Sequence, residues 1–196
     1  MGRRAQERRR SPLTAEERIL GAVLDVLAEH GVDGLSFRSV AQAAGISPAQ
    51  VQYYYRTKRD LVRAGFEYSS GQFLAAVAAA EPATLRELTL QWLPLDEARE
   101  RRARVWLAYT EMAARDEQLA AEAARTDEEL HQWFTGAGVP GPQAAMLLAL
   151  IDGVTAQCLV LPLPRRRELA EKTLLAFLDD QNLDVKLDRW ADGKRV

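Results

Sequence analysis

The stretch GISPAQVQYYYRTKRDL, residues 45–61, places three consecutive tyrosines, Tyr53 to Tyr55, beside polar and basic side chains. Successive residues of a helix point about 100° apart, so three neighbours cannot all enter one core. At least one phenol must therefore face outward. An exposed ring beside basic side chains is typical of a surface that meets another molecule, and the flanking sequence indicates which kind.

Helix signals divide residues 14–80 into four predicted helices. Each predicted helix begins after a Ser or Thr that can act as N-cap, and three of them have an acidic or amide residue where a capping box requires it. These residues are Thr14 with Glu17, Ser36, Ser47 with Gln50, and Thr57 with Asp60. Gly31 and Gly45 end the first two helices, and the fourth helix extends to about Ala80.

Residues 37–55 have the spacing of a helix-turn-helix. Ala41 is small at the point where two helices would cross, and Gly45 can adopt the positive φ that the turn needs. Val51, six residues further on, can seat the second helix on the first.

The rest of the chain also predicts helices, so we expect an all-α fold. The expected elements are 84–93, 96–114, 117–135, 142–160 and 165–181, separated by segments rich in Pro or Gly. The segment from Asn182 to the end is either a frayed tail or a strap packed on the bundle.

Charge is distributed unevenly along the 196 residues. Residues 1–60 contain ten Lys and Arg against seven Asp and Glu, whereas residues 61–196 contain sixteen against twenty-one. Five arginines fall in the first ten residues, namely Arg3, Arg4, Arg8, Arg9 and Arg10. A basic head on an acidic body suggests that the head meets a polyanion, with residues 1–13 as a flexible basic arm that follows the minor groove or the backbone.

Other classes of protein find little support. No apolar run approaches the roughly 20 residues of a membrane span, and the basic N-terminus lacks the apolar region of a secretory signal. The single cysteine, Cys158, suits a reducing cytoplasm. His30 and His131 belong to no ligand cluster, and there is no phosphate loop or nucleophile motif, so we expect neither an enzyme nor a cofactor or metal site. A helical adaptor that does not bind DNA is the remaining rival.

The head resembles the TetR family of transcriptional regulators over residues 14–61. The matching positions are Gly45, Ile46 and Ser47, then Val51, Tyr54 and Tyr55, then Lys58 and Leu61. Gln52 stands where the family usually has a tyrosine. The resemblance implies a three-helix DNA-binding head (residues 14–60) and a larger ligand-binding and dimerising body (residues 61–196). It also implies a repressor that binds a palindromic operator as a homodimer.

The resemblance and side-chain chemistry together predict the DNA contacts. Gln52 can bond adenine and Arg38 can bond guanine in the major groove. Tyr53 and Tyr54 can bond phosphate, or their rings merely cover the hinge, and Tyr55 should pack inward. Gln50 is open between capping and DNA contact. The predicted set is Ser36, Arg38, Ser47, Pro48, Ala49, Gln50, Gln52, Tyr53, Tyr54 and Lys58.

The last long helices are expected to pair with their mates in a dimer, because the resemblance implies a four-helix interface there. The alternative is that residues 142–160, apolar on more than one face, are simply interior to a monomer. The predicted interface residues are Leu148, Ile151, Asp152, Gly153, Thr155, Leu174 and Phe177.

Aromatic residues of the middle helices suggest a ligand pocket. The segment VWLAYTEMAARDEQLA, residues 105–120, resembles the body of the family's choline-responsive, BetI-like branch. The predicted lining residues are Trp106, Tyr109, Met112 and Trp133, with Glu111 and Glu117 nearby to balance a cationic effector. The alternative is an ordinary aromatic core.

Overall fold

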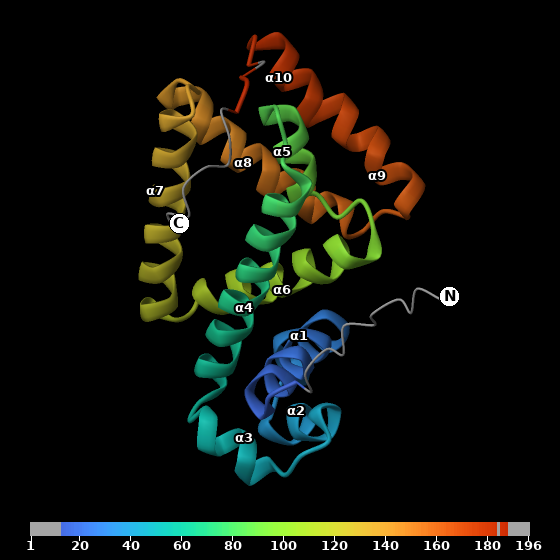
Figure 1. The fold of residues 1–196 in the computed structure, drawn as a ribbon, viewed down its shortest axis with the longest axis vertical. Coiled ribbons are helices and arrows are strands. Elements are labelled where there is room, and N and C mark those ends of the chain that lie inside the picture. Colours follow the sequence, from blue (N-terminus) through green and yellow to red (C-terminus); the bar gives the residue numbers. More distant parts are fainter. Residues whose placement is uncertain (1–12, 184, 188–196) are drawn as a thin grey trace, which may run out of the picture.

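The computed structural model describes residues 13–183 and 185–187, and the helices of this part form a small head below a larger body (Figure 1). The head contains α1 (Ala15–Gly34), α2 (Phe37–Ala44) and α3 (Pro48–Tyr54). The body contains α5 (Leu85–Trp92), α6 (Glu97–Ala113), α7 (Glu117–Gly136) and α8 (Gly141–Cys158), followed by a rod of α9 (Leu163–Ala170), a π-helical segment (Glu171–Leu175) and α10 (Ala176–Asp180). The long helix α4 (Lys58–Ala80) leads from the head into the body (Figure 1). The all-α prediction is confirmed.

Every predicted N-cap of the head is present. Thr14, Ser36, Ser47 and Thr57 each accept a hydrogen bond from the backbone N–H three residues on, and each belongs to a reciprocal capping box. Each such cap contributes about 1 kcal/mol, which matters for helices as short as α2 and α3. The box at Ser36 uses Ser39, which the sequence analysis did not identify.

Two glycines of the head have a positive φ; Gly45 ends α2 as predicted, whereas the prediction that Gly31 ends the first helix is wrong. Gly45 follows α2 with φ 66°, and the N–H of Ile46 donates to the Ala41 carbonyl at 3.0 Å, which closes the turn of the helix-turn-helix. Gly31 has φ 63° and interrupts the helical backbone of α1, although helical geometry resumes and α1 ends only at Gly34. L-residues with side chains rarely adopt these φ values, so both positions favour glycine.

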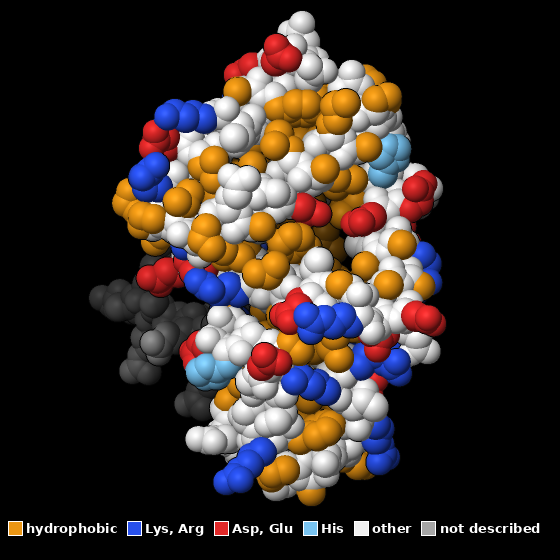
Figure 2. Space-filling view, turned by 180° about the vertical axis from the view of Figure 1, so that it is seen from behind, with side chains coloured by type: hydrophobic (Ala, Val, Ile, Leu, Met, Phe, Trp, Pro, Cys, Tyr) orange, Lys and Arg blue, Asp and Glu red, His pale blue; other side chains and the backbone are white. Residues whose placement is uncertain are grey.

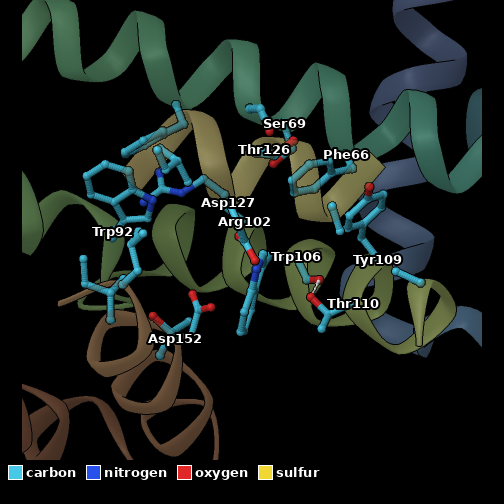
Figure 3. A pocket seen from close by; sticks show the side chains of 18 of the residues that line it. Phe66, Ser69, Trp92, Arg102, Trp106, Tyr109, Thr110, Thr126, Asp127 and Asp152 are labelled. Carbon is cyan, nitrogen blue, oxygen red and sulfur yellow. Dashed lines mark hydrogen bonds between the residues drawn. The ribbon is translucent and has the colours of Figure 1, made fainter. Parts of the chain in front are cut away.

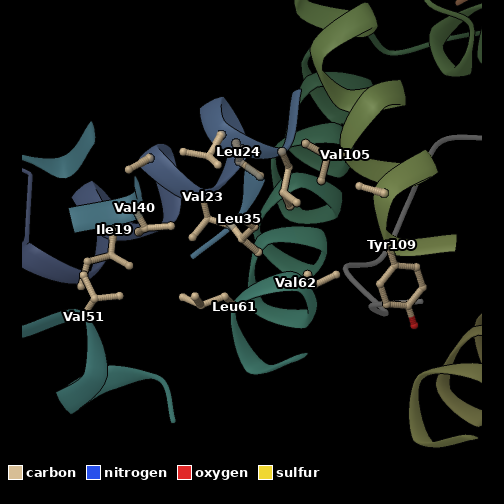
Figure 4. Packing of buried hydrophobic residues seen from close by; sticks show 14 of the residues in the cluster. Ile19, Val23, Leu24, Leu35, Val40, Val51, Leu61, Val62, Val105 and Tyr109 are labelled. Atoms are coloured by element: carbon tan, nitrogen blue, oxygen red, sulfur yellow. The ribbon is translucent and has the colours of Figure 1, made fainter. Parts of the chain in front are cut away.

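The core of the head extends into the body. Ile19, Val40, Val51 and Leu61 are fully buried in one cluster that also contains Val105 of α6 (Figure 4). Further α6 residues of the same cluster are Ala108, Tyr109 and Ala113. Because α6 packs directly on α1, the head shares its core with α6 and is not a separately packed unit.

Gly65 lets α4 approach α1 closely. It is buried, and a Cβ built at this position would lie 2.7 Å from Cγ1 of Val23 on α1. Carbon atoms in contact are normally about 3.5–4.0 Å apart, so only glycine allows this approach without movement of a neighbour.

A second core lies between α7, α8 and the C-terminal rod. Phe134, Leu147 and Leu174 are fully buried within it. A strap from the chain end closes the upper part: the N–H of Leu85 donates to the Val185 carbonyl at 2.9 Å, and the N–H of Leu187 donates to the Ala83 carbonyl at 2.9 Å. Residues 185–187 are therefore a strap, while the rest of the predicted tail, residue 184 and residues 188–196, lies outside the described residues.

A buried arginine joins the rod to the middle of the body. Arg166 is 5 % exposed and pairs with Glu100 of α6 at 2.7 Å. The same guanidinium donates to the carbonyls of Pro94 and Leu161, both at 2.9 Å. The hydrogen bond from Arg166 and the nearby Arg104 lower the pKa of Glu100 despite its partial desolvation. No described helix is long and apolar enough to cross a membrane.

Candidate DNA-binding surface and ligand cavity

The helix α3 presents a polar and aromatic face to solvent. Val51 is fully buried and anchors the helix, while Gln52 is exposed. Tyr53 is 76 % and Tyr54 is 42 % exposed, and their rings meet edge to face at 5.4 Å between centroids. The two outward phenols therefore form a projecting pair at the tip of the head, as the three-tyrosine sequence requires.

The third tyrosine turns inward. Tyr55 is half-buried against the head core, and burial, aided by the charges of Glu16 and Glu67, raises its phenol pKa to about 12. Tyr55 therefore stays neutral across the physiological range. The residue that follows the hinge, Lys58, is half-buried in the first turn of α4, where an ammonium and a helix N-terminus can both attract an anion.

The other predicted DNA-contacting residues also lie on the head surface. Arg38, Ser36, Pro48 and Ala49 are exposed. The carbonyl oxygen Oε1 of Gln50 accepts a hydrogen bond from its N-cap backbone N–H at 3.2 Å, so its capping role is realised in this structure. The arginines of the predicted arm lie outside the described residues.

A cavity of about 270 Å³ opens between α4, α6, α7 and α8 (Figure 3). Aromatic side chains make most of its walls. Phe66 of α4 stacks on Tyr109 of α6 with centroids 4.0 Å apart, and Figure 3 shows Trp92 at the opposite end. Phe73, Trp106 and Trp133 complete the aromatic lining.

Two carboxylates also line the cavity, Asp127 from α7 and Asp152 from α8. Figure 2 shows a hollow on this face of the body with acidic side chains at its rim. Desolvation by the surrounding walls, and then the charge of Asp127, raises the pKa of Asp152 to about 6. Desolvation likewise raises the pKa of Asp127. Both carboxylates also reach solvent, and a cation in the cavity would add a counter-charge beside them.

One cation lines the same cavity. The guanidinium of Arg102 lies 4.6 Å from the centroid of the Phe73 ring and donates to the Gln91 carbonyl near the end of α5. Desolvation, followed by repulsion from Arg99, lowers the pKa of Arg102 to about 10, so it remains charged at neutral pH.

The predicted pocket needs correction at three positions. Trp106, Tyr109 and Trp133 line the cavity, but Met112 does not, because it packs against the core shared by the head and α6. Glu111 and Glu117 are exposed and do not line it.

The sequence analysis missed the α4 wall and the charged residues of the cavity. Phe66, Ser69, Ser70 and Phe73 recur at the spacing of one helix face, which was a readable signal. Asp127 interrupts the apolar stripe that runs from Leu119 to Phe134 along α7, and such an interruption is a second signal. No comparable signal distinguishes Arg102 from the other arginines of α6.

Part of the predicted dimer interface is buried inside the protomer. Leu174 is fully buried, Ile151 is 3 % exposed and Thr155 is 6 % exposed, so these three residues have almost no surface left for a mate. Their burial follows from α8 packing on its own C-terminal rod. Leu148 and Phe177 are half-buried, whereas Asp152 and Gly153 are exposed.

Comparison with family models gives two adjacent matches. Residues 19–64 match the model of bacterial regulatory proteins of the tetR family, and residues 82–182 match the C-terminal model of BetI-type transcriptional repressors. The chain belongs to the TetR family of transcriptional regulators. These matches cover the helix-turn-helix and the walls of the cavity from α5 to α8, while the α4 residues that line the cavity lie between the two matches.

Solved structures agree with this family. A transcriptional regulator from Rhodococcus sp. Rha1 has 30 % identity and a TM-score of 0.69, covering 85 % of this chain and 97 % of its own. The multidrug binding protein EbrR, complexed with malachite green, has 28 % identity and a TM-score of 0.64, and the match covers 85 % of this chain and 98 % of EbrR. A regulator from Saccharomonospora viridis in complex with choline shares the fold at 21 % identity and a TM-score of 0.62, covering 84 % and 95 %. No curated protein sequence matches this TetR-family chain.

Proposed function

We propose that this TetR-family regulator is a ligand-responsive repressor that binds an inverted-repeat operator as a homodimer. The observation that carries the proposal is the course of α4, which begins at Lys58 beside the tyrosine pair and lines the ligand cavity with Phe66 and Phe73. One helix thus connects the surface that would meet DNA to the cavity that would hold an effector. The proposed division of labour is residues 14–60 for DNA and residues 61–196 for ligand and dimer.

The exposed head residues have distinct roles in this proposal. Gln52 and Arg38 would contact base edges, because amide and guanidinium groups make bidentate bonds to adenine and guanine. Tyr53, Tyr54 and Lys58 would contact phosphates and fix the register of the head on the duplex. The remaining proposed contacts are Ser36, Ser47, Pro48, Ala49 and Gln50, of which the last can reach DNA only by leaving its capping bond.

The dimer would form through the exposed face of α8 and the start of the rod. Met146 is 57 %, Val160 84 % and Leu163 41 % exposed, which is a large apolar exposure for one face. A Cβ at Gly153 would meet no atom of its own chain within 4 Å, so a mate's helix could approach closely there. Two heads related by two-fold symmetry would then enter major grooves about 34–36 Å apart, or a multiple of that, which requires a symmetric operator.

The effector would be a small, largely apolar molecule with a positive charge. Aromatic faces attract quaternary ammonium groups by about 0.5–2 kcal/mol per ring, and the Asp127–Asp152 pair supplies the counter-charge. EbrR, with its malachite green complex, supports this choice because that ligand is an aromatic cation. Filling the cavity would favour one spacing of α4 and α6, and therefore one spacing of the two heads.

Operator binding with and without effector tests the proposal. Fluorescence anisotropy with DNA from upstream of the protein's own coding region should show binding that weakens steeply with salt. Adding an aromatic cation such as malachite green should change operator affinity by about 5–150-fold, the usual range of allosteric coupling. Salt-insensitive behaviour or the absence of DNA binding would favour the adaptor class.

A further inference from the structure

The ligand cavity carries charges of both signs that do not neutralise one another. Within residues 13–183 and 185–187, neither Asp127 nor Asp152 forms an ion pair or a hydrogen bond. Among the same residues, no carboxylate lies within ion-pair distance of Arg102. Both kinds of charge line the cavity, so each is available to a ligand.

The neighbouring Arg99 serves as a comparison, because its contacts are those of a purely structural residue. Arg99 donates to the Leu90 carbonyl at 2.9 Å and pairs with Asp96 at 2.8 Å. It therefore stabilises the end of α5 and carries its own counter-ion, and it does not line the cavity. Arg102 also donates to this helix end, at Gln91, and it lines the cavity; among the described residues the charge of Asp96 acts on it, but from beyond ion-pair distance.

The position of Arg102 within the cavity is well suited to an acidic group. Among the described residues, one of its five N–H groups is used, in a hydrogen bond to the Gln91 carbonyl, while Phe73 covers its face. A guanidinium with free N–H groups in a poorly solvated wall binds carboxylates strongly, because two parallel charge-assisted hydrogen bonds can form. A ligand with only a positive charge would leave this group without a partner.

We propose that the ligand of this cavity is a zwitterion. Its cationic group lies against Asp127, Asp152 and the aromatic faces, and its carboxylate lies against Arg102. This inference rests on the ligand-responsive function proposed above and narrows the class of effector. A zwitterion offers a counter-charge to the carboxylates and to Arg102 at once, whereas a simple cation or a simple anion offers one to only one of them.

Matched probes test the cationic group and the carboxylate of the ligand separately. The probes are ω-(trimethylammonio)alkanoates of increasing chain length, each paired with its methyl ester, which keeps the cation and the shape but removes the negative charge. Isothermal titration calorimetry on the full-length protein measures the affinity of both members of each pair. We expect the zwitterion of the best-fitting length to bind at least about tenfold more tightly than its ester, as is usual for hydrogen bonds to charged groups.

Three arginine variants identify the source of this preference. Arg102→Gln should abolish the preference and leave the affinity for the ester within a few-fold of wild type, and the matched control Arg99→Gln should keep the preference. Arg102→Lys retains the charge and should retain part of the preference, which serves as a second variant if Arg102→Gln unfolds. Thermal unfolding of each variant identifies loss of structure.

Three results would overturn the proposal that the ligand is a zwitterion. One is an equal affinity of the wild type for a zwitterion and its methyl ester. Another is a preference for the zwitterion that persists in Arg102→Gln. The third is failure of every zwitterion to bind while malachite green binds. The operator-binding measurement is independent of these three results. If malachite green releases the protein from DNA, the proposed function stands even when the zwitterion proposal fails.

Discussion

Substitution of Gly65 by alanine tests whether the crossing of α4 and α1 is as tight as the structure has it. The new Cβ would lie 2.7 Å from Cγ1 of Val23 and 3.5 Å from Cδ1 of Leu27. Val23 is fully buried and β-branched, so its methyl group has few alternative positions. Either the side chain leaves its rotamer or α4 moves away from α1.

The expected magnitude comes from two opposing terms. Inserting a methyl group into a filled core costs about 1–3 kcal/mol, while replacing glycine by alanine inside a helix contributes roughly 1 kcal/mol of stability. The net effect of Gly65→Ala on the free energy of unfolding is therefore a loss of about 0–2 kcal/mol. Gly71 lies on the same helix with no atom within 4 Å of a built Cβ, so Gly71→Ala should gain the helical term alone.

The comparison of the two variants isolates the steric term. Because both substitutions gain the same helical propensity, their difference should be about 1–3 kcal/mol, or roughly 2–12 °C in Tm for a chain of this size. Thermal unfolding followed by circular dichroism at one protein concentration measures this difference. If Gly65→Ala stabilised the protein as much as Gly71→Ala, the close crossing of α4 on α1 would be refuted.

Four further predictions concern DNA, pH, assembly and the buried ion pair. Gln52→Ala should reduce the free energy of DNA binding by roughly 1–3 kcal/mol through one operator position only. Lys58→Ala should instead weaken binding to all operator sequences alike and reduce the slope of affinity against salt by about one. Fluorescence anisotropy on operator variants measures both effects. Affinity for malachite green should fall about tenfold between pH 8 and pH 5, because protonation of Asp152, whose pKa is about 6, removes a counter-charge; a flat profile would contradict this. Gly153→Arg should shift sedimentation from dimer to monomer, and an unchanged dimer would place the interface elsewhere. Arg166→Met should lower the free energy of unfolding by about 1–3 kcal/mol, since it removes the donor to the Pro94 and Leu161 carbonyls and to one oxygen of Glu100, which keeps its pairing with Arg104; an unchanged stability would contradict this role of Arg166.

The pH prediction depends on the direction in which the pKa of Asp152 is shifted. A carboxyl with a raised pKa is more easily protonated in the folded protein, so the protein favours the neutral form of Asp152 below about pH 6. A cation binds the ionised form and therefore gains affinity as the pH rises through this value. The other titratable groups that line the cavity are Arg102, Tyr109 and Asp127, and desolvation raises the pKa of Asp127 as well.

Local signals made the head predictable from the sequence. Caps such as Ser47 and turns such as Gly45 act through bonds that span at most five residues, so the sequence contains both partners of each interaction. Part of the aromatic lining, namely Trp106, Tyr109 and Trp133, was also predictable, because bulky rings at helical spacing must cluster somewhere; Phe66 and Phe73 of α4 were not identified. Burial of Leu174 was not, because nothing in its own helix distinguishes a face that meets the same chain from one that meets a mate.

Charge in the cavity was the hardest feature to anticipate. Glu111 is close to Trp106 in the sequence, yet it points to solvent and pairs with Arg115 of the next turn at 3.8 Å. The carboxylates that do line the cavity, Asp127 and Asp152, come from two helices whose pairing depends on the tertiary fold. Sequence proximity therefore identified the kind of group correctly but the wrong residues.

The structure also adds a second route between ligand and DNA. Besides α4, Tyr109 offers such a route, because it belongs both to the cavity wall and to the core that holds the head. Its ring stacks on Phe66 of α4, and its helix packs on α1. Arg59 and Arg63 of α4 further pair with Asp116 at 3.4 Å and Glu122 at 3.6 Å. A ligand that displaced the Tyr109 ring would therefore act on α4 and on α1 together, so that the head would move as one unit with the helix that carries it.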